Sequence, residues 1–168
     1  MNPHRHILTS PQFSALITAI LAAAVASTEA KKLSHSQATA KLRAAGIKWT
    51  SSGGCSDRNT ATCTSFTQVR EETIDGAITL KRACGCDITI TGGTETGHAS
   101  GTYSHWNGYK LDMRKASGLN GYITRTFTRI SNRSDGAKRY KANSGNIYAV
   151  SLESPPLSTF DGDKWGTR

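Results

Sequence analysis

The sequence has only one long apolar run, and this run lies at the N-terminus. It extends from Phe13 to Ala26, follows Arg5 and two histidines, and is followed by small residues up to position 30. Basic, apolar and small residues in this order are typical of a secretory signal peptide, so we predict a signal peptide over 1–30 and a mature chain over 31–168. A membrane anchor is the alternative, but the run is shorter than the roughly 20 apolar residues that a bilayer requires. Because no second run approaches that length, we expect a secreted, extracellular protein without a membrane span.

Acidic residues are scarce relative to basic ones. The chain has 12 Asp and Glu against 21 Lys and Arg, which gives a formal net charge of +9. A basic exported protein is attracted to polyanions, such as bacterial wall polymers, acidic polysaccharide, nucleic acid or anionic membrane. The alternative is a charged surface that only keeps the protein in solution. The chain also lacks internal repeats and low-complexity runs, and its 168 residues favour a single domain, which we expect to be a monomer.

Cysteine is limited to Cys55, Cys63, Cys84 and Cys86. In an oxidising compartment such thiols form bridges, and four of them allow three pairings. Because only one residue separates Cys84 from Cys86, we expect two bridges that tie the Cys55–Cys63 loop to the Cys84–Cys86 turn. A single Cys55–Cys63 bridge with one or both other thiols free is an alternative, and a zinc–thiolate site is a weaker one, because the spacings match structural zinc poorly. Asn132 begins an N-glycosylation sequon, which has meaning in a eukaryotic host.

Two capping boxes predict the main helices. The box at Ser34 to Gln37 predicts a helix over 35–45, and the box at Ser65 to Gln68 predicts the longest helix, which ends near residue 83. A mixed apolar pattern over 119–130 is interpreted as a third helix. Alternation and turn residues predict extended segments at 47–50, 87–91 and 107–113, and a hairpin of 138–142 with 147–150. We therefore predict an α+β domain in which a small antiparallel sheet packs against two main helices.

The residues that indicate a chemical function are two histidines and one aspartate, spaced seven residues apart. His98, His105 and Asp112 repeat at this interval, and no histidine follows them in the chain. Imidazole nitrogens and carboxylate oxygens are the ligands of zinc in sites that keep one position open for water. The glycine and the alternation after His105 indicate a turn that enters a strand, so His105 and Asp112 are predicted to converge on a metal ion. For His98 three roles stay open: third ligand, hydrogen-bond donor to a ligand carboxylate, or residue of the substrate cleft.

The segment from Ser104 to Asp112 resembles the S-x-H-x-x-G-x-A-x-D signature of the D-Ala-D-Ala metallopeptidases. Ser104, His105, Gly108 and Asp112 match it, while Lys110 stands where a small residue is usual. These zinc carboxypeptidases and endopeptidases share a fold with the hedgehog signalling domain. The resemblance implies that fold, one zinc ion held by His105 and Asp112, and hydrolysis of amides next to D-amino acids in peptidoglycan stem peptides.

The C-terminal tail departs from this family. The resemblance implies a third ligand in an E-x-x-H-W motif, and the best counterpart places Asp161 at the catalytic base and Lys164 at the histidine. A protonated lysine has no lone pair for a cation. Glu153 is the alternative base, and His98 is the alternative third ligand.

The predicted substrate-binding residues are Glu95, Ser104 and Arg114. Glu95 occupies the neighbourhood where the family often places an arginine that orients the substrate, so a substrate carboxylate would be bound by another cation, namely Lys48, Arg70 or Arg114.

Three functions follow from these features. The first is a secreted zinc peptidase that acts on peptidoglycan. The second is a module of the same fold with a lapsed metal centre, which binds cell-wall peptide or another acidic polymer. The third is a small secreted ribonuclease that uses His98, Glu95 and Arg114 without a metal.

Overall fold

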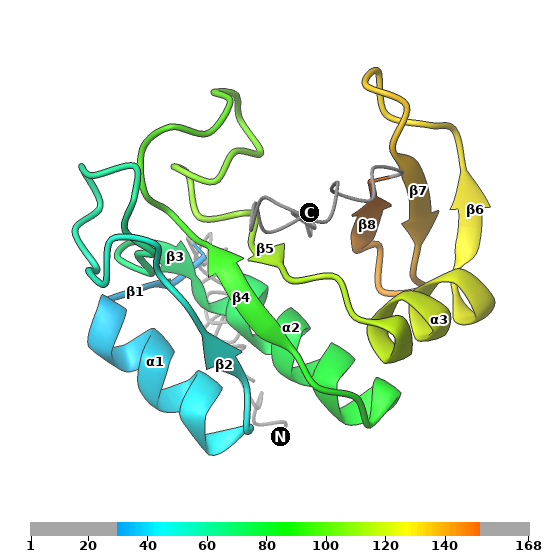
Figure 1. Ribbon diagram of the computed structural model, residues 1–168, viewed down its shortest axis with the longest axis horizontal. Coiled ribbons are helices and arrows are strands. Elements are labelled where there is room, and N and C mark those ends of the chain that lie inside the picture. Colours follow the sequence, from blue (N-terminus) through cyan, green and yellow to red (C-terminus); the bar gives the residue numbers. More distant parts are fainter. Residues whose placement is uncertain (1–29, 152–168) are drawn as a thin grey trace, which may run out of the picture.

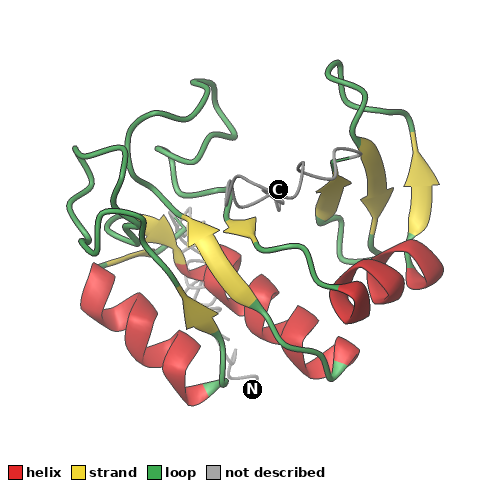
Figure 2. Cartoon of the chain, in the orientation of Figure 1, coloured by secondary structure: helices red, strands yellow, loops and turns green. Residues whose placement is uncertain are grey.

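The structure is a computed structural model that describes residues 30–151. It confirms the α+β class, with three helices and small sheets (Figures 1 and 2). We call residues 30–113, with α1, α2 and β1 to β5, the N-terminal lobe, and residues 114–151, with α3 and β6 to β8, the C-terminal lobe. The predicted signal peptide up to residue 29 and the tail residues Glu153, Asp161 and Lys164 lie outside the described residues.

The first helix confirms its sequence signal. Helix α1 spans His35–Ala44. The Ser34 hydroxyl accepts a hydrogen bond from the Gln37 N–H at 3.2 Å, and the Gln37 side chain accepts one from the Ser34 N–H at 2.9 Å. The helix ends before Gly46, whose φ of 69° lies in the left-handed region that glycine adopts without strain.

The second helix starts later than its capping box predicted. Helix α2 spans Glu71–Cys84, and Ser65 to Gln68 is not helical. The carbonyl of Ser65 instead accepts a hydrogen bond from the Thr94 N–H at 2.6 Å, and Gln68 has a φ of 66°. The prediction of the start was wrong because tertiary contacts use the backbone groups that a helix would need. Strand β3 (Val69–Arg70) precedes α2 and pairs antiparallel with β1 (Lys32–Leu33).

The expected single antiparallel sheet is replaced by three small sheets. In the central one, β4 (Thr89–Gly92) pairs in parallel with β2 (Lys48–Trp49) and antiparallel with β5 (Asp112–Met113). The parallel pair arises because α2 lies in the connection between β2 and β4, and a crossover returns the chain in the same direction. The strand expected over 107–113 is reduced to β5, since the residues before it form turns.

The C-terminal lobe contains the predicted hairpin. Its elements are α3 (Ser117–Thr126), β6 (Thr128–Ile130), β7 (Lys138–Lys141) and β8 (Ile147–Val150), with strand order β6-β7-β8. The helix expected to run to residue 130 ends at Thr126, and the following residues form an additional strand. Leu119 and Ile123 of α3 belong to the same hydrophobic cluster as the buried face of α2, so one core joins the two lobes.

The disulfide pairing corrects the sequence-based expectation. Cys55 pairs with Cys63 and Cys84 with Cys86, at Cα–Cα distances of 4.7 and 5.1 Å. The bridge across one residue forms because Gly85 ends α2 in the left-handed conformation, with φ of 60°, and reverses the chain. No thiol is left free, which excludes the zinc–thiolate alternative and the single-bridge alternative. Paired cysteines are compatible with an oxidising compartment. Within residues 30–151, no helix has the length and apolar character that a membrane crossing requires.

Candidate metal centre

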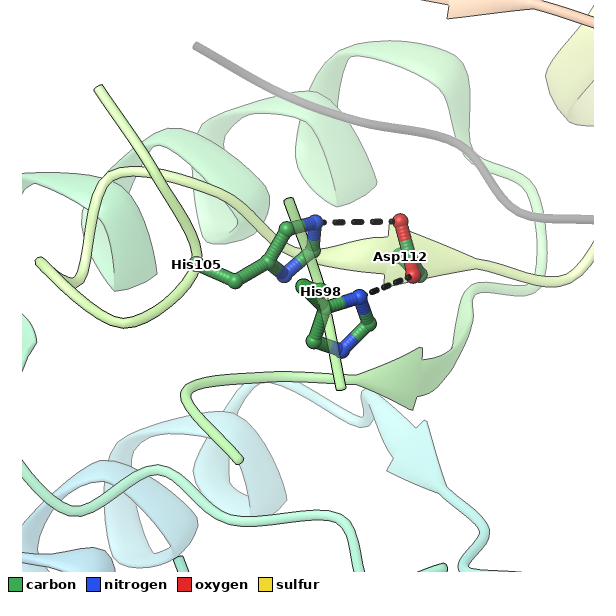
Figure 3. Close-up of side chains that lie close together, drawn as sticks. All are labelled: His98, His105 and Asp112. Carbon is green, nitrogen blue, oxygen red and sulfur yellow. Dashed lines mark ion pairs between the residues drawn. The ribbon is translucent and has the colours of Figure 1, made fainter. Parts of the chain in front are cut away.

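His98, His105 and Asp112 come together at the end of the central sheet (Figure 3). Each offers one ligand atom, and these atoms all lie within 4.8 Å of one another. His98 Nδ1 is 3.7 Å from Asp112 Oδ2, and His105 Nε2 is 3.4 Å from Asp112 Oδ1. The two imidazole rings are stacked, with centroids 3.9 Å apart. The predicted convergence of His105 and Asp112 is therefore confirmed, and His98 joins them.

Two glycines allow this approach. Asp112 on β5 pairs with Gly92 on β4, and a Cβ atom on Gly92 would lie 2.8 Å from Asp112 Oδ2. The absence of a side chain there leaves room for the carboxylate. Gly108, with φ of 80°, closes the turn after His105, and a Cβ atom on it would lie 2.5 Å from the Gln68 carbonyl oxygen. The glycine of the sequence motif is thus needed to pack this turn against the backbone of Gln68 to Arg70.

The hydrogen bonds of the two rings leave their other nitrogens directed at Asp112. His105 Nδ1 lies 2.8 Å from the Gly93 carbonyl oxygen, and a carbonyl only accepts, so Nδ1 carries the proton. His98 Nε2 lies 3.0 Å from Glu95 Oε1. An ionised Glu95 likewise only accepts, which makes Nε2 the donor. The lone pairs of His105 Nε2 and His98 Nδ1 then face the Asp112 carboxylate, as in metal sites whose histidines are held from behind.

The group fits a metal ion. Asp112 Oδ2 is buried and has no hydrogen-bond partner, which is costly unless a cation compensates it. Tetrahedral zinc with bonds of about 2.0–2.1 Å separates its ligand atoms by about 3.3–3.4 Å, close to the two distances given above. Two histidines and one carboxylate also make up the ligand set of non-haem iron(II) sites. The geometry therefore supports a metal site, while the choice of zinc belongs to the proposal below.

Glu95 supports the site from a buried position. Its carboxylate accepts hydrogen bonds from the Ser65 N–H at 2.8 Å, the Gly93 N–H at 3.0 Å and the His98 ring. Burial alone would raise the pKa of Glu95, but the hydrogen bonds from His98, Ser65 and Gly93 outweigh it and hold the pKa below its usual value. The structure thus places Glu95, predicted to bind substrate, where it orients His98. The three-residue spacing of Glu95 and His98 in a turn is the sequence signal that indicated this contact.

Arg58 was missed by the sequence analysis. Its guanidinium donates to the carbonyl oxygens of Thr94, at 3.3 Å, and of Trp106, and it lies 3.6 Å above the Trp106 ring. The Arg58 carbonyl accepts a hydrogen bond from the Thr96 N–H at 2.8 Å. Trp106 is the neighbour of His105, and Cys55–Cys63 closes the loop that carries Arg58. This disulfide loop therefore braces the segments that hold Glu95 and His105, and nothing in the spacing of these residues along the chain indicated it.

The other predicted site residues have different surroundings. Ser104 is buried, and its hydroxyl accepts a hydrogen bond from the Asn107 N–H at 3.2 Å, which shapes the turn of His105. Arg114 is exposed directly after β5. Asn132 is exposed, and its side chain accepts a hydrogen bond from Arg129. The substrate roles of Ser104 and Arg114 and the glycosylation of Asn132 stay predictions, as do the base roles of Glu153 and Asp161.

Comparison with known proteins finds no match: no protein-family model, no curated protein and no solved structure matches this chain. The likeness to the D-Ala-D-Ala metallopeptidases rests on Ser104, His105, Gly108 and Asp112. The α+β architecture of the described residues does not identify a family. The function therefore has to be inferred from the geometry of the site.

Proposed function

We propose that this protein is a secreted zinc peptidase that hydrolyses amide bonds next to D-amino acids in bacterial peptidoglycan stem peptides. The observation that carries the proposal is the orientation of His98 and His105, which are held from behind so that one lone pair of each faces the Asp112 carboxylate, whose buried Oδ2 has no hydrogen-bond partner. Three protein ligands with an open fourth position are the arrangement of catalytic zinc sites. The peptide substrate comes from the signature that Ser104 to Asp112 resembles.

The residues of the site divide into ligands and orienting groups. His98, His105 and Asp112 would hold the ion, and a zinc ion bound there supplies a Lewis acid that activates water and polarises a carbonyl. Glu95 keeps the His98 ring in the binding orientation, and the Gly93 carbonyl does the same for His105. In this proposal His98 takes the ligand position for which the C-terminal motif offers only Lys164.

The water proton needs a separate acceptor. Asp112 is a ligand in this proposal, and Glu95 already accepts hydrogen bonds from two backbone N–H groups and His98, so neither is available as the base. The proposed base is Asp161, the counterpart of the glutamate in the motif that the resemblance implies, with Glu153 as the alternative.

The test compares two carboxylate variants of the mature protein. Asp112→Asn removes the charge at the site, and Asp87→Asn removes one from a side chain that is 91% exposed. The measurements are metal content by mass spectrometry and release of D-alanine from a stem pentapeptide. We expect stoichiometric zinc and chelator-sensitive hydrolysis in the wild type and in Asp87→Asn, and loss of both in Asp112→Asn.

Other results would identify the alternatives. Iron in place of zinc would refute the peptidase assignment while keeping the metal site. Wall binding that ignores chelator, without hydrolysis, would favour the binding module. Chelator-insensitive cleavage of RNA that is lost in His98→Ala would favour the ribonuclease.

A further inference from the structure

The two disulfides of the protein close loops of very different length. Cys84 and Cys86 have a sequence separation of 2, whereas Cys55 and Cys63 have a separation of 8. A disulfide stabilises a fold largely by restricting the unfolded chain, and this contribution falls as the closed loop becomes shorter. The fold resists reduction of a bridge by as much as that bridge stabilises the fold. The Cys84–Cys86 bridge is therefore the easier of the two to reduce.

The Cys84–Cys86 bridge can be approached from solvent. Gly85, between the two cysteines, is exposed, and the cysteines themselves are partly buried. Apart from the chain neighbours of Gly85, no heavy atom lies within 4 Å of the position that a Cβ atom on it would occupy. Thiol–disulfide exchange requires a thiolate to reach one of the two sulfurs, and the open space beside Gly85 permits this approach.

The first turn of α3 packs against Cys86, where the last turn of α2 and the start of α3 lie side by side (Figure 1). A Cβ atom on Gly118, the second residue of α3, would lie 3.3 Å from the Cys86 Cβ. No side-chain hydrogen bond caps this end of α3, and its first turn contains no acidic residue. The positive end of the helix dipole therefore lies beside Cys86 and stabilises a thiolate there.

The surroundings of the two sulfurs differ. Cys84 lies at the carboxyl-terminal end of α2, where the helix dipole disfavours a negative charge. The Cys84 sulfur accepts a hydrogen bond from the Cys86 N–H at 3.1 Å. The ammonium group of Lys81 donates to the Cys86 carbonyl oxygen at 2.8 Å, and its partner carboxylate, Asp87, is 91% exposed. Cys86 is thus the sulfur that leaves more readily as a thiolate when the bridge is attacked.

We infer that the Cys84–Cys86 disulfide is redox-active and oxidises pairs of thiols in other proteins of an oxidising compartment. A substrate thiolate attacks the Cys84 sulfur, forms a mixed disulfide with it and displaces Cys86 as a thiolate. The second substrate thiolate attacks the substrate sulfur of this mixed disulfide, which completes the substrate disulfide and releases Cys84. Two electrons and two protons pass from the substrate dithiol to the cysteine pair. A low-molecular-weight disulfide, such as oxidised glutathione, reoxidises the pair by the same exchanges in reverse.

The experiment uses the mature, disulfide-bonded protein and two measurements at neutral pH. Equilibration in glutathione buffers of graded ratio, followed by alkylation and peptide mass spectrometry, gives the reduced fraction of each bridge. Chromatography gives the rate at which a reduced two-cysteine peptide is oxidised in a glutathione buffer. The test variant is Cys84→Ser/Cys86→Ser, and the matched control is Cys55→Ser/Cys63→Ser. His105→Ala is a second control that keeps both bridges.

The equilibrium constant for reduction by glutathione should be roughly 10-fold or more higher for Cys84–Cys86 than for Cys55–Cys63. The wild type and both controls should speed oxidation of the peptide roughly 10-fold or more over the buffer, and the test variant should not. Retention of this activity in His105→Ala would separate it from the metal centre.

Ser117→Asp tests the contribution of α3. The substitution adds a carboxylate at the exposed first position of the helix, where an acid stabilises the helix itself. It should nevertheless slow oxidation of the peptide about twofold or more, because a negative charge beside Cys86 disfavours its thiolate. Equal reduction of the two bridges, a wild type no faster than the buffer, or activity that persists in Cys84→Ser/Cys86→Ser would each overturn the inference.

Discussion

The two lobes organise their charged groups in opposite ways. The N-terminal lobe gathers the partly buried His98 with the buried His105, Glu95 and Asp112 in a small cluster, and pairs several of its surface cations with acids. The C-terminal lobe has eight basic residues and one acidic residue, and four of the basic residues lie on strands β6 and β7. A buried cluster obtains specificity because each polar atom needs a defined partner, whereas an excess of exposed positive charge acts through its long-range field. We therefore expect substitutions in the two lobes to affect different properties.

The largest effect is expected from His105→Ala. It removes one of three ligands, so metal affinity should fall by more than the roughly 10- to 100-fold that loss of a supporting residue costs. Hydrolysis of the stem peptide should be lost with the metal. Mass spectrometry measures the metal content, and release of D-alanine measures the hydrolysis. Stoichiometric zinc in the variant would remove His105 from the ligand set.

The two disulfides should differ in effect although both lie in the N-terminal lobe. Cys55→Ser/Cys63→Ser opens a loop with a sequence separation of 8 and should lower the free energy of unfolding by about 2–3 kcal/mol. It should also weaken metal binding, because the loop carries Arg58. Cys84→Ser/Cys86→Ser, with a separation of 2, should cost only about 1.5 kcal/mol and leave metal affinity unchanged. Denaturant unfolding and metal titration of both variants check this, and equal losses of metal affinity would show that the Arg58 loop does not support the site.

A third effect is expected from Glu95→Gln. The amide has nearly the shape of the carboxylate, but it has one acceptor oxygen instead of two and cannot accept from both His98 and the Ser65 N–H, so the support of the His98 ring is weakened. Metal affinity should fall roughly 10- to 100-fold, and the absorption spectrum of a cobalt-substituted protein should shift. Glu72→Gln, an exposed carboxylate of the same lobe, is the control. A role for Glu95 in folding alone would lower the unfolding free energy and leave the cobalt spectrum of the folded protein intact.

The smallest effect concerns Asp135, the acid of the C-terminal lobe. The hydrogen bond from Arg133 and that from the Ala137 N–H lower the pKa of Asp135 from 3.8 to about 2. Because this carboxylate pKa is depressed in the folded state, its stabilisation is present above pH 3.8 and is lost as the pH falls through about 2. The side chains are half exposed, so the stabilisation should stay under about 1 kcal/mol.

Denaturant unfolding of the wild type and Asp135→Asn measures this difference. It should be visible at pH 6 and vanish near pH 2. A difference in stability that persists at pH 2 would show that Asp135 contributes through its shape rather than its charge.

Local signals predicted the elements whose stabilising contacts lie within a few residues. The capping box of Ser34 and Gln37 forms α1, and the turn between β7 and β8 forms the hairpin. The box at Ser65 failed because a distant residue, Glu95, takes the backbone N–H of Ser65, and Thr94 takes its carbonyl. Propensity describes what a segment prefers when nothing else competes for its backbone groups. Long-range hydrogen bonds provided that competition here.

The order of residues along the chain determined the α+β class, the ligand types and the seven-residue spacing that brings His105 and Asp112 to one site. These properties follow from short-range geometry, because a turn and the strand after it have few ways to place their side chains. Only the tertiary structure decided the disulfide pairing, the inclusion of His98, the position of Glu95 behind it and the contact of Arg58 with Trp106. The Cys84–Cys86 bridge needs the chain reversal at Gly85. The other contacts bring together residues that are separated in the sequence, and the packing of the whole core sets the distances between them.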